Sequence, residues 1–249
     1  DKMGLKASET RSLVFTDSME LIDCSDPSAC VFRPVVLPPE RAQIHDVQVR
    51  GDRLYAFTQY GLDGIGRSGV VVYDISRPER PTFAAFFGCD ACERCGEDEG
   101  AALGGDYAYL LCHGEERSGQ LRVVDLRGPE YRVVGVLALN GGTWEGMKVA
   151  AIGRELHILG DDVHGILDVS QPTAPAPSRR STDAFFRDVE TWAAVGGFLY
   201  VSDWEGLHVV PPSGAQVVPA PNTLQGANAV TVVDHRAYVI QGEDGPAGN

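Results

Sequence analysis

The sequence lacks long apolar runs, helical periodicity and an excess of basic residues. No window reaches the roughly 18–20 consecutive apolar residues that a membrane-spanning helix requires, so we expect no membrane span. Apolar residues do not recur at helical spacing, which argues against an α-helical fold. The 21 basic residues are outnumbered by 35 acidic ones, and a net charge of −14 makes nucleic acid an unfavourable partner. Basic protein surfaces, small cationic ligands and metal ions are the partners that this charge favours.

Sequence signatures of catalysis are also absent. No nucleophile and base stand at a spacing that indicates a catalytic pair, although a fold can bring distant residues together. The stretch Gly61-Leu-Asp-Gly-Ile-Gly66 lacks the strand-to-helix context of a phosphate-binding loop. We therefore expect no catalytic residues and favour a function other than catalysis. The start at Asp1-Lys2, without an initiator Met or a signal-peptide segment, is expected of a processed or trimmed chain.

A short apolar strand that ends in an aspartate and a proline-rich turn recurs along the chain. The clearest copy is Gly69-Val-Val-Val-Tyr-Asp-Ile-Ser-Arg-Pro78, and a turn box such as Gly51-Asp-Arg-Leu-Tyr55 precedes it. A repeat of about 40–50 residues that contains only strands is typical of propeller blades. Successive copies stand 51 or 43 residues apart, with the aspartate at Asp23, Asp74, Asp125 and Asp168 and with Pro211 in its place in the fifth copy.

Each unit reads as four short strands, a to d, rich in Val, Ile, Tyr and Phe and bounded by Gly, Pro, Asp and Ser. We therefore predict an all-β fold, a β-propeller of about six four-stranded blades in which the first and last are incomplete. Five blades that close irregularly are the alternative, because an open blade edge exposes unpaired backbone groups. The chain is expected to form a single domain, residues 1–249, with units at about 13–37, 46–87, 99–138, 145–181, 188–218 and 226–241.

The two boxes resemble the LVIVD-repeat family of β-propellers. The family repeat combines a Gly-Asp-x-Ala-Tyr strand, as in Gly105-Asp-Tyr-Ala-Tyr109, with a Gly-Leu-x-Val-x-Asp-x-Ser-x-Pro-x-x-Pro strand, as in residues 165–175. The likeness runs from Leu13 to Tyr238, and the fifth copy departs from it by losing its Asp. The resemblance implies a propeller fold and a bacterial surface or secreted setting, and it implies no defined activity.

Up-and-down topology predicts that the entries to strand a lie on one face of the ring, together with the b–c loops. Polar residues cluster at these entries, around the central channel. Carboxylates there would hold Ca²⁺ or a cationic group through oxygen ligands. The alternative is that they are solvated turn residues of an acidic protein. The candidate ligands are His45, Asp46, Glu99, Glu145, Glu190 and Asn228.

Six cysteines clustered in loops favour disulfides and an oxidising setting: extracellular, at the cell surface or in the periplasm. Cys24 and Cys30 flank a c–d turn, where we expect a local disulfide. The second group lies on the face that carries the acidic entries. It would form two disulfides or, as the alternative, bind Zn²⁺ or an iron–sulfur cluster with the help of His113. This group consists of Cys89, Cys92, Cys95 and Cys112.

Three hypotheses about function follow. The first is a non-enzymatic extracellular or cell-surface propeller that binds a protein or a small cationic ligand on a rigid scaffold. The second is a metal-dependent hydrolase or lyase whose site at the channel mouth is formed by His45, Asp46, Glu99 and Glu190. The third is a structural subunit of a larger surface assembly, in which a partner strand completes the sixth unit. No cofactor is firmly implied.

Overall fold

The structure, a computed structural model, consists of short β-strands joined by turns. No helix in the described part of the chain is long and apolar enough to cross a membrane. The described residues are 5–7, 13–16, 20–23, 31–34, 44–58, 69–77, 80–88, 94–95, 100–113, 119–139, 147–160, 163–178, 189, 191–203, 206–211, 218–219, 227–233 and 236–241.

These strands form six antiparallel sheets, each made of strands that follow one another in the chain. The first contains β1 (Leu5–Ala7), β2 (Leu13–Thr16), β3 (Glu20–Asp23) and β4 (Val31–Pro34). The second contains β5 (Ile44–Arg50), β6 (Arg53–Thr58), β7 (Gly69–Asp74) and β8 (Thr82–Gly88). The third contains β9 (Arg94–Cys95), β10 (Ala101–Gly104), β11 (Tyr107–His113), β12 (Gly119–Asp125) and β13 (Val133–Leu139).

The remaining three sheets come from the second half of the chain. The fourth contains β14 (Lys148–Ile152), β15 (Glu155–Gly160), β16 (Val163–Asp168) and β17 (Ala176–Pro177). The fifth contains β18 (Thr191–Val195), β19 (Phe198–Asp203), β20 (Gly206–Val210) and β21 (Val218–Pro219). The sixth contains β22 (Ala227–Val233) and β23 (Arg236–Gln241).

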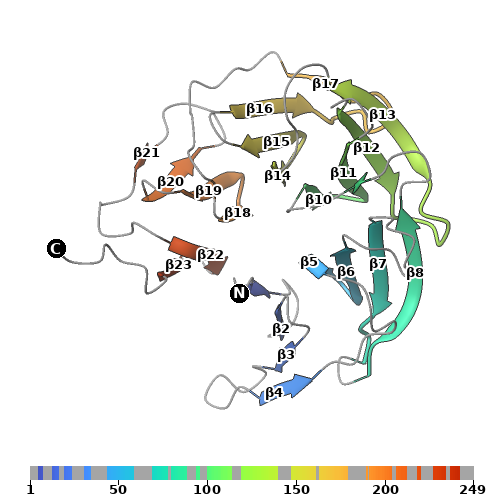
Figure 1. The fold of residues 1–249 in the computed structure, drawn as a ribbon, viewed down its shortest axis with the longest axis vertical. Helices are drawn as coiled ribbons and strands as arrows, with labels where there is room; N and C mark the ends of the chain where they lie inside the picture. Colours follow the sequence, from blue (N-terminus) through green and yellow to red (C-terminus); the bar gives the residue numbers. More distant parts are fainter. Residues whose placement is uncertain are drawn as a thin grey trace.

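The six sheets stand around a common centre, and we refer to them as blades one to six (Figure 1). The strands nearest the centre are β1, β5, β10, β14, β18 and β22. Contacts of β1 with both β22 and β5 close the ring between the last blade and the second. The predicted all-β propeller of about six blades is confirmed. Residues 5–7 supply strand a of blade one, which therefore has four strands, whereas blade six has two in the described residues.

The a–b hairpins turn through glycines in the left-handed region. Gly51, Gly105 and Gly153 have φ values of 54°, 55° and 60°. A two-residue hairpin turn of this kind matches the twist of its strands only when φ is positive, a conformation that costs glycine little. The Gly-Asp box of the sequence is thus a turn signal, and Arg50-Gly51-Asp52 is part of a hairpin.

Neighbouring blades pack through apolar residues that alternate along their strands. Phe57 of blade two and Leu110 of blade three share one buried cluster, and Leu121 of blade three shares another with Leu156 of blade four. Fully burying a side chain of this size contributes about 1.5–3 kcal/mol. Each blade is therefore stabilised mainly by the neighbours that cover its two faces.

Candidate functional site

The candidate ligands of the acidic ring lie at or just before the starts of the inner strands β5, β10, β14, β18 and β22. His45 and Asn228 belong to β5 and β22, and only their backbones are described. Glu99, Glu145 and Glu190 lie outside the described residues. The topology brings the five strand entries to one face of the ring. Among the candidate ligands, the described side chain is that of Asp46.

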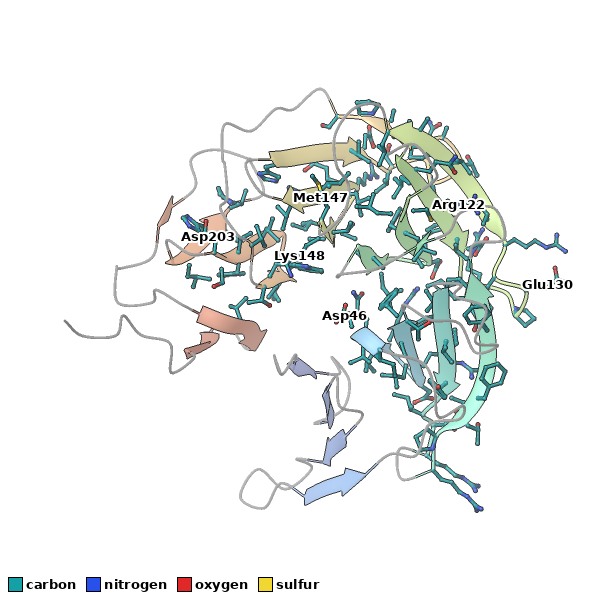
Figure 2. The ribbon with its side chains drawn as sticks, viewed as in Figure 1. Asp46, Arg122, Glu130, Met147, Lys148 and Asp203 are labelled. Atoms are coloured by element: carbon teal, nitrogen blue, oxygen red, sulfur yellow. The ribbon has the colours of Figure 1, made fainter. Side chains whose placement is uncertain are left out.

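Asp46 is buried at the inner edge of blade two, where Figure 2 labels it. The side-chain amide of Gln48 donates to its carboxylate over 3.0 Å and to the carbonyl oxygen of Ala101 over 3.2 Å. The oxygen of the same amide accepts from the backbone N–H of Leu103 at 2.9 Å. Gln48 thus links the inner strands β5 and β10 through hydrogen bonds, and Asp46 belongs to this polar contact between blades two and three.

Blade four breaks the acidic pattern at the inner edge. Met147 precedes His157 by ten residues, the same spacing by which the candidate ligand His45 precedes Tyr55 in blade two. The side chain of Met147 is buried. Lys148 follows it at the start of β14, so a cation stands at this entry (Figure 2). No group of three or more His, Cys, Asp or Glu side chains with the geometry of a metal site occurs among the residues described. The cation site at the channel mouth stays a prediction.

The cysteine cluster involves strand b of blade three. The short strand β9 pairs with the end of β11, which sets Cys95 opposite Cys112 and Arg94 opposite His113. The sulfur of Cys112 is in a disulfide. Cys24, Cys30, Cys89 and Cys92 lie outside the described residues, and the side chains of Cys95 and His113 do as well. The complete set of disulfides and the alternative Zn²⁺ or iron–sulfur site therefore remain predictions.

The repeated aspartates fix the turns between strands c and d. The Oδ1 atoms of Asp74, Asp125 and Asp168 accept from the backbone N–H two residues later, at 2.9, 2.9 and 2.8 Å. An aspartate that bonds its own backbone in this way stabilises a turn. The residue after each aspartate also donates its N–H to the a–b turn: Ile75 to Asp52, Leu126 to Asp106 and Val169 to Arg154, each at 2.9 Å.

These hydrogen bonds hold the aspartates ionised. The side chain of Arg127 donates to Asp125 and lowers the pKa of that carboxyl group to about 2. The bonds from Ser76 and Ser170 lower the pKa of Asp74 and Asp168 in the same direction. Each carboxylate is already engaged by its own turn and lies on the face opposite the strand entries. We conclude that the aspartate of the repeat has a structural role.

A buried and a half-buried histidine pair within blade four. Nδ1 of His157 lies 2.9 Å from Nε2 of His164 across strands β15 and β16. Burial, together with the nearby His157, lowers the pKa of His164 to about 3, so His164 is neutral at physiological pH. His157 is buried, which indicates a role in packing. The pair with His164 has no signature in the sequence, because it forms only when the two strands align.

A buried aspartate pairs with a partly buried histidine at the b–c hairpin of blade five. Oδ1 of Asp203 accepts from Nε2 of His208 at 2.7 Å and from the backbone N–H of Gly206 at 3.1 Å. Asp203 is 1% exposed, and the surrounding residues Leu199 and Val201 pack on blade four. No sequence pattern points to this pair, because His208 stands in an alternating apolar strand. Because the carboxylate of Asp203 is shielded from water, we infer that the Asp203–His208 pair stabilises the hairpin.

The outer rim of blades two and three is apolar. The outermost strands β8 and β13 have seven residues each and contain no charged residue. Phe83 on β8 is 48% exposed, and Val136 on β13 is 55% exposed. Tyr131, which precedes β13, has an unusual φ of 43° and stacks on Phe87 of β8 with a ring-centroid distance of 5.0 Å. The rim is therefore an ordered surface that joins the two blades.

Comparison with known proteins supports the fold. The LVIVD repeat matches residues 187–211, and no curated protein matches the chain. A functionally unknown protein from Desulfotomaculum acetoxidans is 8% identical with a TM-score of 0.63, covering 97% of this chain and 73% of its own. The periplasmic gluconolactonase of Pseudomonas aeruginosa is 21% identical with a TM-score of 0.53, covering 86% and 67%.

A third solved structure, a nidogen/laminin complex, contains a chain that is 11% identical with a TM-score of 0.58, over 90% of this chain and 81% of its own. At these identities the similarities concern the fold alone. They agree with the six sheets around one centre and with the repeat in blade five. The chain therefore has a β-propeller fold, and the LVIVD repeat matches its fifth blade, over residues 187–211.

Proposed function

We propose that this propeller is a non-enzymatic scaffold that binds a partner protein outside the cytoplasm. The observation that carries the proposal is the uncharged, exposed outer rim formed by β8 and β13. Exposed apolar patches on soluble proteins commonly mark interaction sites, and aromatic residues are enriched at the centres of interfaces. The rim supplies such a surface on a rigid frame.

The rim differs from the outer edges of the next two blades. The outermost strands β17 and β21 have two residues each, and each ends in a proline. Short strands and prolines protect a sheet edge against pairing with other chains. The strands β8 and β13 are long and contain neither proline nor charge, so blades two and three lack this protection.

The chemistry of the rim specifies its partner. A chain with a net charge of −14 attracts basic surfaces over most of its area. The rim has no charge to pair with such a surface, and burying an unpaired charge against it would be unfavourable. The partner therefore contributes an uncharged surface with apolar or aromatic side chains.

Two observations support the proposed location outside the cytoplasm. Six cysteines favour an oxidising compartment, and the sulfur of Cys112 is in a disulfide. Among the solved structures with a similar fold, one is a periplasmic gluconolactonase and another belongs to a nidogen/laminin complex. The hydrolase alternative requires His45, Asp46, Glu99 and Glu190 to act together, and the described carboxylate of Asp46 is engaged by Gln48.

The rim is tested with paired double variants. The rim variant, Phe83→Ser with Val136→Ser, removes two exposed apolar side chains and is expected to weaken partner binding by at least about tenfold. The control variant, Val195→Ser with Phe198→Ser, removes the same residue types at 40% and 39% exposure from blade five. Proteins captured from the surface and secreted fraction by the wild-type chain are quantified against each variant.

The proposal requires a protein that the wild-type and control chains capture and the rim variant does not. Equal capture by all three chains, or loss with the control variant instead, would contradict a binding site on the rim. Melting temperatures of the three chains are compared first, so that loss of binding is read only from folded protein.

A further inference from the structure

Arg122 is a partly buried cation in the middle of strand β12. Its Nε atom is buried without a hydrogen-bond partner, and Arg122 makes no ion pair within the described part of the chain. A guanidinium group stays charged and carries N–H donors but no acceptor. Burying such a donor without an acceptor is unfavourable, so the packing of blade three gains nothing from this charge.

Cross-strand pairing places Arg122 beside the outer rim of blades two and three. It lies opposite Leu110 on β11 and opposite Val136 on β13, so the three side chains share one face of blade three. Leu110 belongs to the buried cluster that contains Phe87 of β8, so this face is turned toward blade two. Val136 is 55% exposed. Arg122, which Figure 2 labels, therefore lies one strand inside the rim.

The corresponding position in blade two holds no charge. Val71 precedes Asp74 by three residues, as Arg122 precedes Asp125, and Val71 is fully buried. Arg127 of blade three, by contrast, is paired with Asp125. An apolar residue thus satisfies the packing at this position, and the unpaired charge of Arg122 calls for a different explanation. Departures from packing rules of this kind are expected at functional positions.

We propose that Arg122 binds the side-chain carboxylate of a glutamate on the partner protein. The inference rests on the proposed function, because the same partner covers Val136 on the rim. A carboxylate accepts two parallel hydrogen bonds from a guanidinium group. A phosphate group, with nearly two charges, is less suited to a single arginine in a chain with a net charge of −14.

Glutamate is the acidic residue that fits the position. Neighbouring strands lie about 4.8 Å apart, so a carboxylate that enters from the rim must reach past β13 to Arg122. A long side chain does this while its backbone stays outside. The partner surface over β8 and β13 remains uncharged, and the one carboxylate beside it is not left unpaired, because Arg122 receives it. The site thus adds charge selectivity to an apolar contact.

Synthetic peptides test the proposal without the partner protein. One is acetyl-Ser-Phe-Val-Glu-Val-Phe-Ser-amide, and a second has Gln in place of Glu. Binding to the intact chain labelled with nitrogen-15 is followed through the backbone amide signals of β12 and β13. The glutamate peptide is expected to bind about tenfold more tightly, since a charge-assisted hydrogen bond is stronger than a neutral one. A third peptide, with Gln and a free terminal carboxylate, should bind no better than the second.

The variant Arg122→Met removes the charge and keeps an apolar side chain of similar length. It should bind the glutamate and glutamine peptides equally. It should also melt at the same temperature as the wild type or higher, because an unpaired buried charge is lost. The control variant Arg154→Met removes an exposed arginine from the a–b turn of blade four and should keep the tenfold preference of about the wild-type size.

Three results would overturn the proposal. The first is equal affinity of the wild-type chain for the two amidated peptides, or no binding of either at millimolar concentration. The second is a lower melting temperature of Arg122→Met, which would show that the guanidinium is paired in the fold. The third is displacement of the glutamate peptide by inorganic phosphate more readily than by acetate at equal ionic strength. A glutamate preference without any protein captured through the rim would contradict the proposed function and leave the role of Arg122 intact.

Discussion

Replacing Gly135 with alanine is expected to lower the free energy of unfolding by about 2–3 kcal/mol, because the added methyl group overpacks the contact between blades three and four. A Cβ atom at this position would stand 2.1 Å from the carbonyl oxygen of Pro172 and 3.2 Å from Cδ of Pro175. Both neighbours belong to the c–d turn of blade four. Either β13 or that turn must therefore shift, which loosens the contact between blades three and four.

Gly128→Ala is the matched control. Gly128 lies in the turn before β13, and a Cβ atom there would have nothing within 4 Å. A surface change of this kind should alter stability by no more than about 0.5 kcal/mol. Urea unfolding of the two variants and the wild type measures the difference. Equal stability of Gly135→Ala and Gly128→Ala would show that blade four does not pack on β13 as described.

Asp203→Ala is expected to cost about 3 kcal/mol, since it leaves the buried N–H of Gly206 and the partly buried ring of His208 without their acceptor. The carboxylate accepts from His208 at 2.7 Å and from the N–H of Gly206 at 3.1 Å, and it is shielded from water. An unsatisfied buried polar group costs about 1–3 kcal/mol. Asp203→Asn retains an oxygen acceptor and should cost less than half as much.

The exposed ion pair of Asp106 with Arg50, at 2.6 Å, provides the comparison. Surface pairs contribute about 0–1 kcal/mol, so Asp106→Ala should have a small effect. Denaturation midpoints of the three variants measure the order of stability. If Asp203→Ala and Asp106→Ala lower the stability equally, then water reaches Asp203 and its pair with His208 does not stabilise the interior of the blade.

Much of the fold could be predicted from the sequence because its signals are local and repeated. A glycine favours a hairpin turn because it can adopt a positive φ, as Gly51 does. An aspartate favours a turn because its side chain can accept a hydrogen bond from the nearby backbone, as that of Asp74 does. Both features depend on residues next to them in the chain. Their repetition along the chain then implies similar units side by side, and a ring follows from the need to cover each unit on two faces.

The prediction of an incomplete first blade was wrong, because residues 5–7, which have no strong strand pattern, form its strand a. The structure pairs them with β2 and sets them against β22 and β5. Contacts between the two ends of the chain determine this strand, and no local preference encodes them. Tertiary context decides strand formation in such cases.

The polar pairs could not be predicted for a related reason. His208 stands two residues after the glycine that opens strand c, where blades two and three have the buried residues Val71 and Leu121. Its partner Asp203 lies across the hairpin, so their contact depends on register. The exposed apolar rim was also not predicted. The apolar residues of β13 do not show, from sequence alone, which face of the strand the next blade covers.

Peptide-resolved hydrogen exchange on the unmodified chain tests the central claim, a ring of blades whose second strands are interior. We predict slow exchange in β6, β11, β15 and β19, each of which pairs with a strand on both sides. Fast exchange throughout β6 or β15 would contradict the ring.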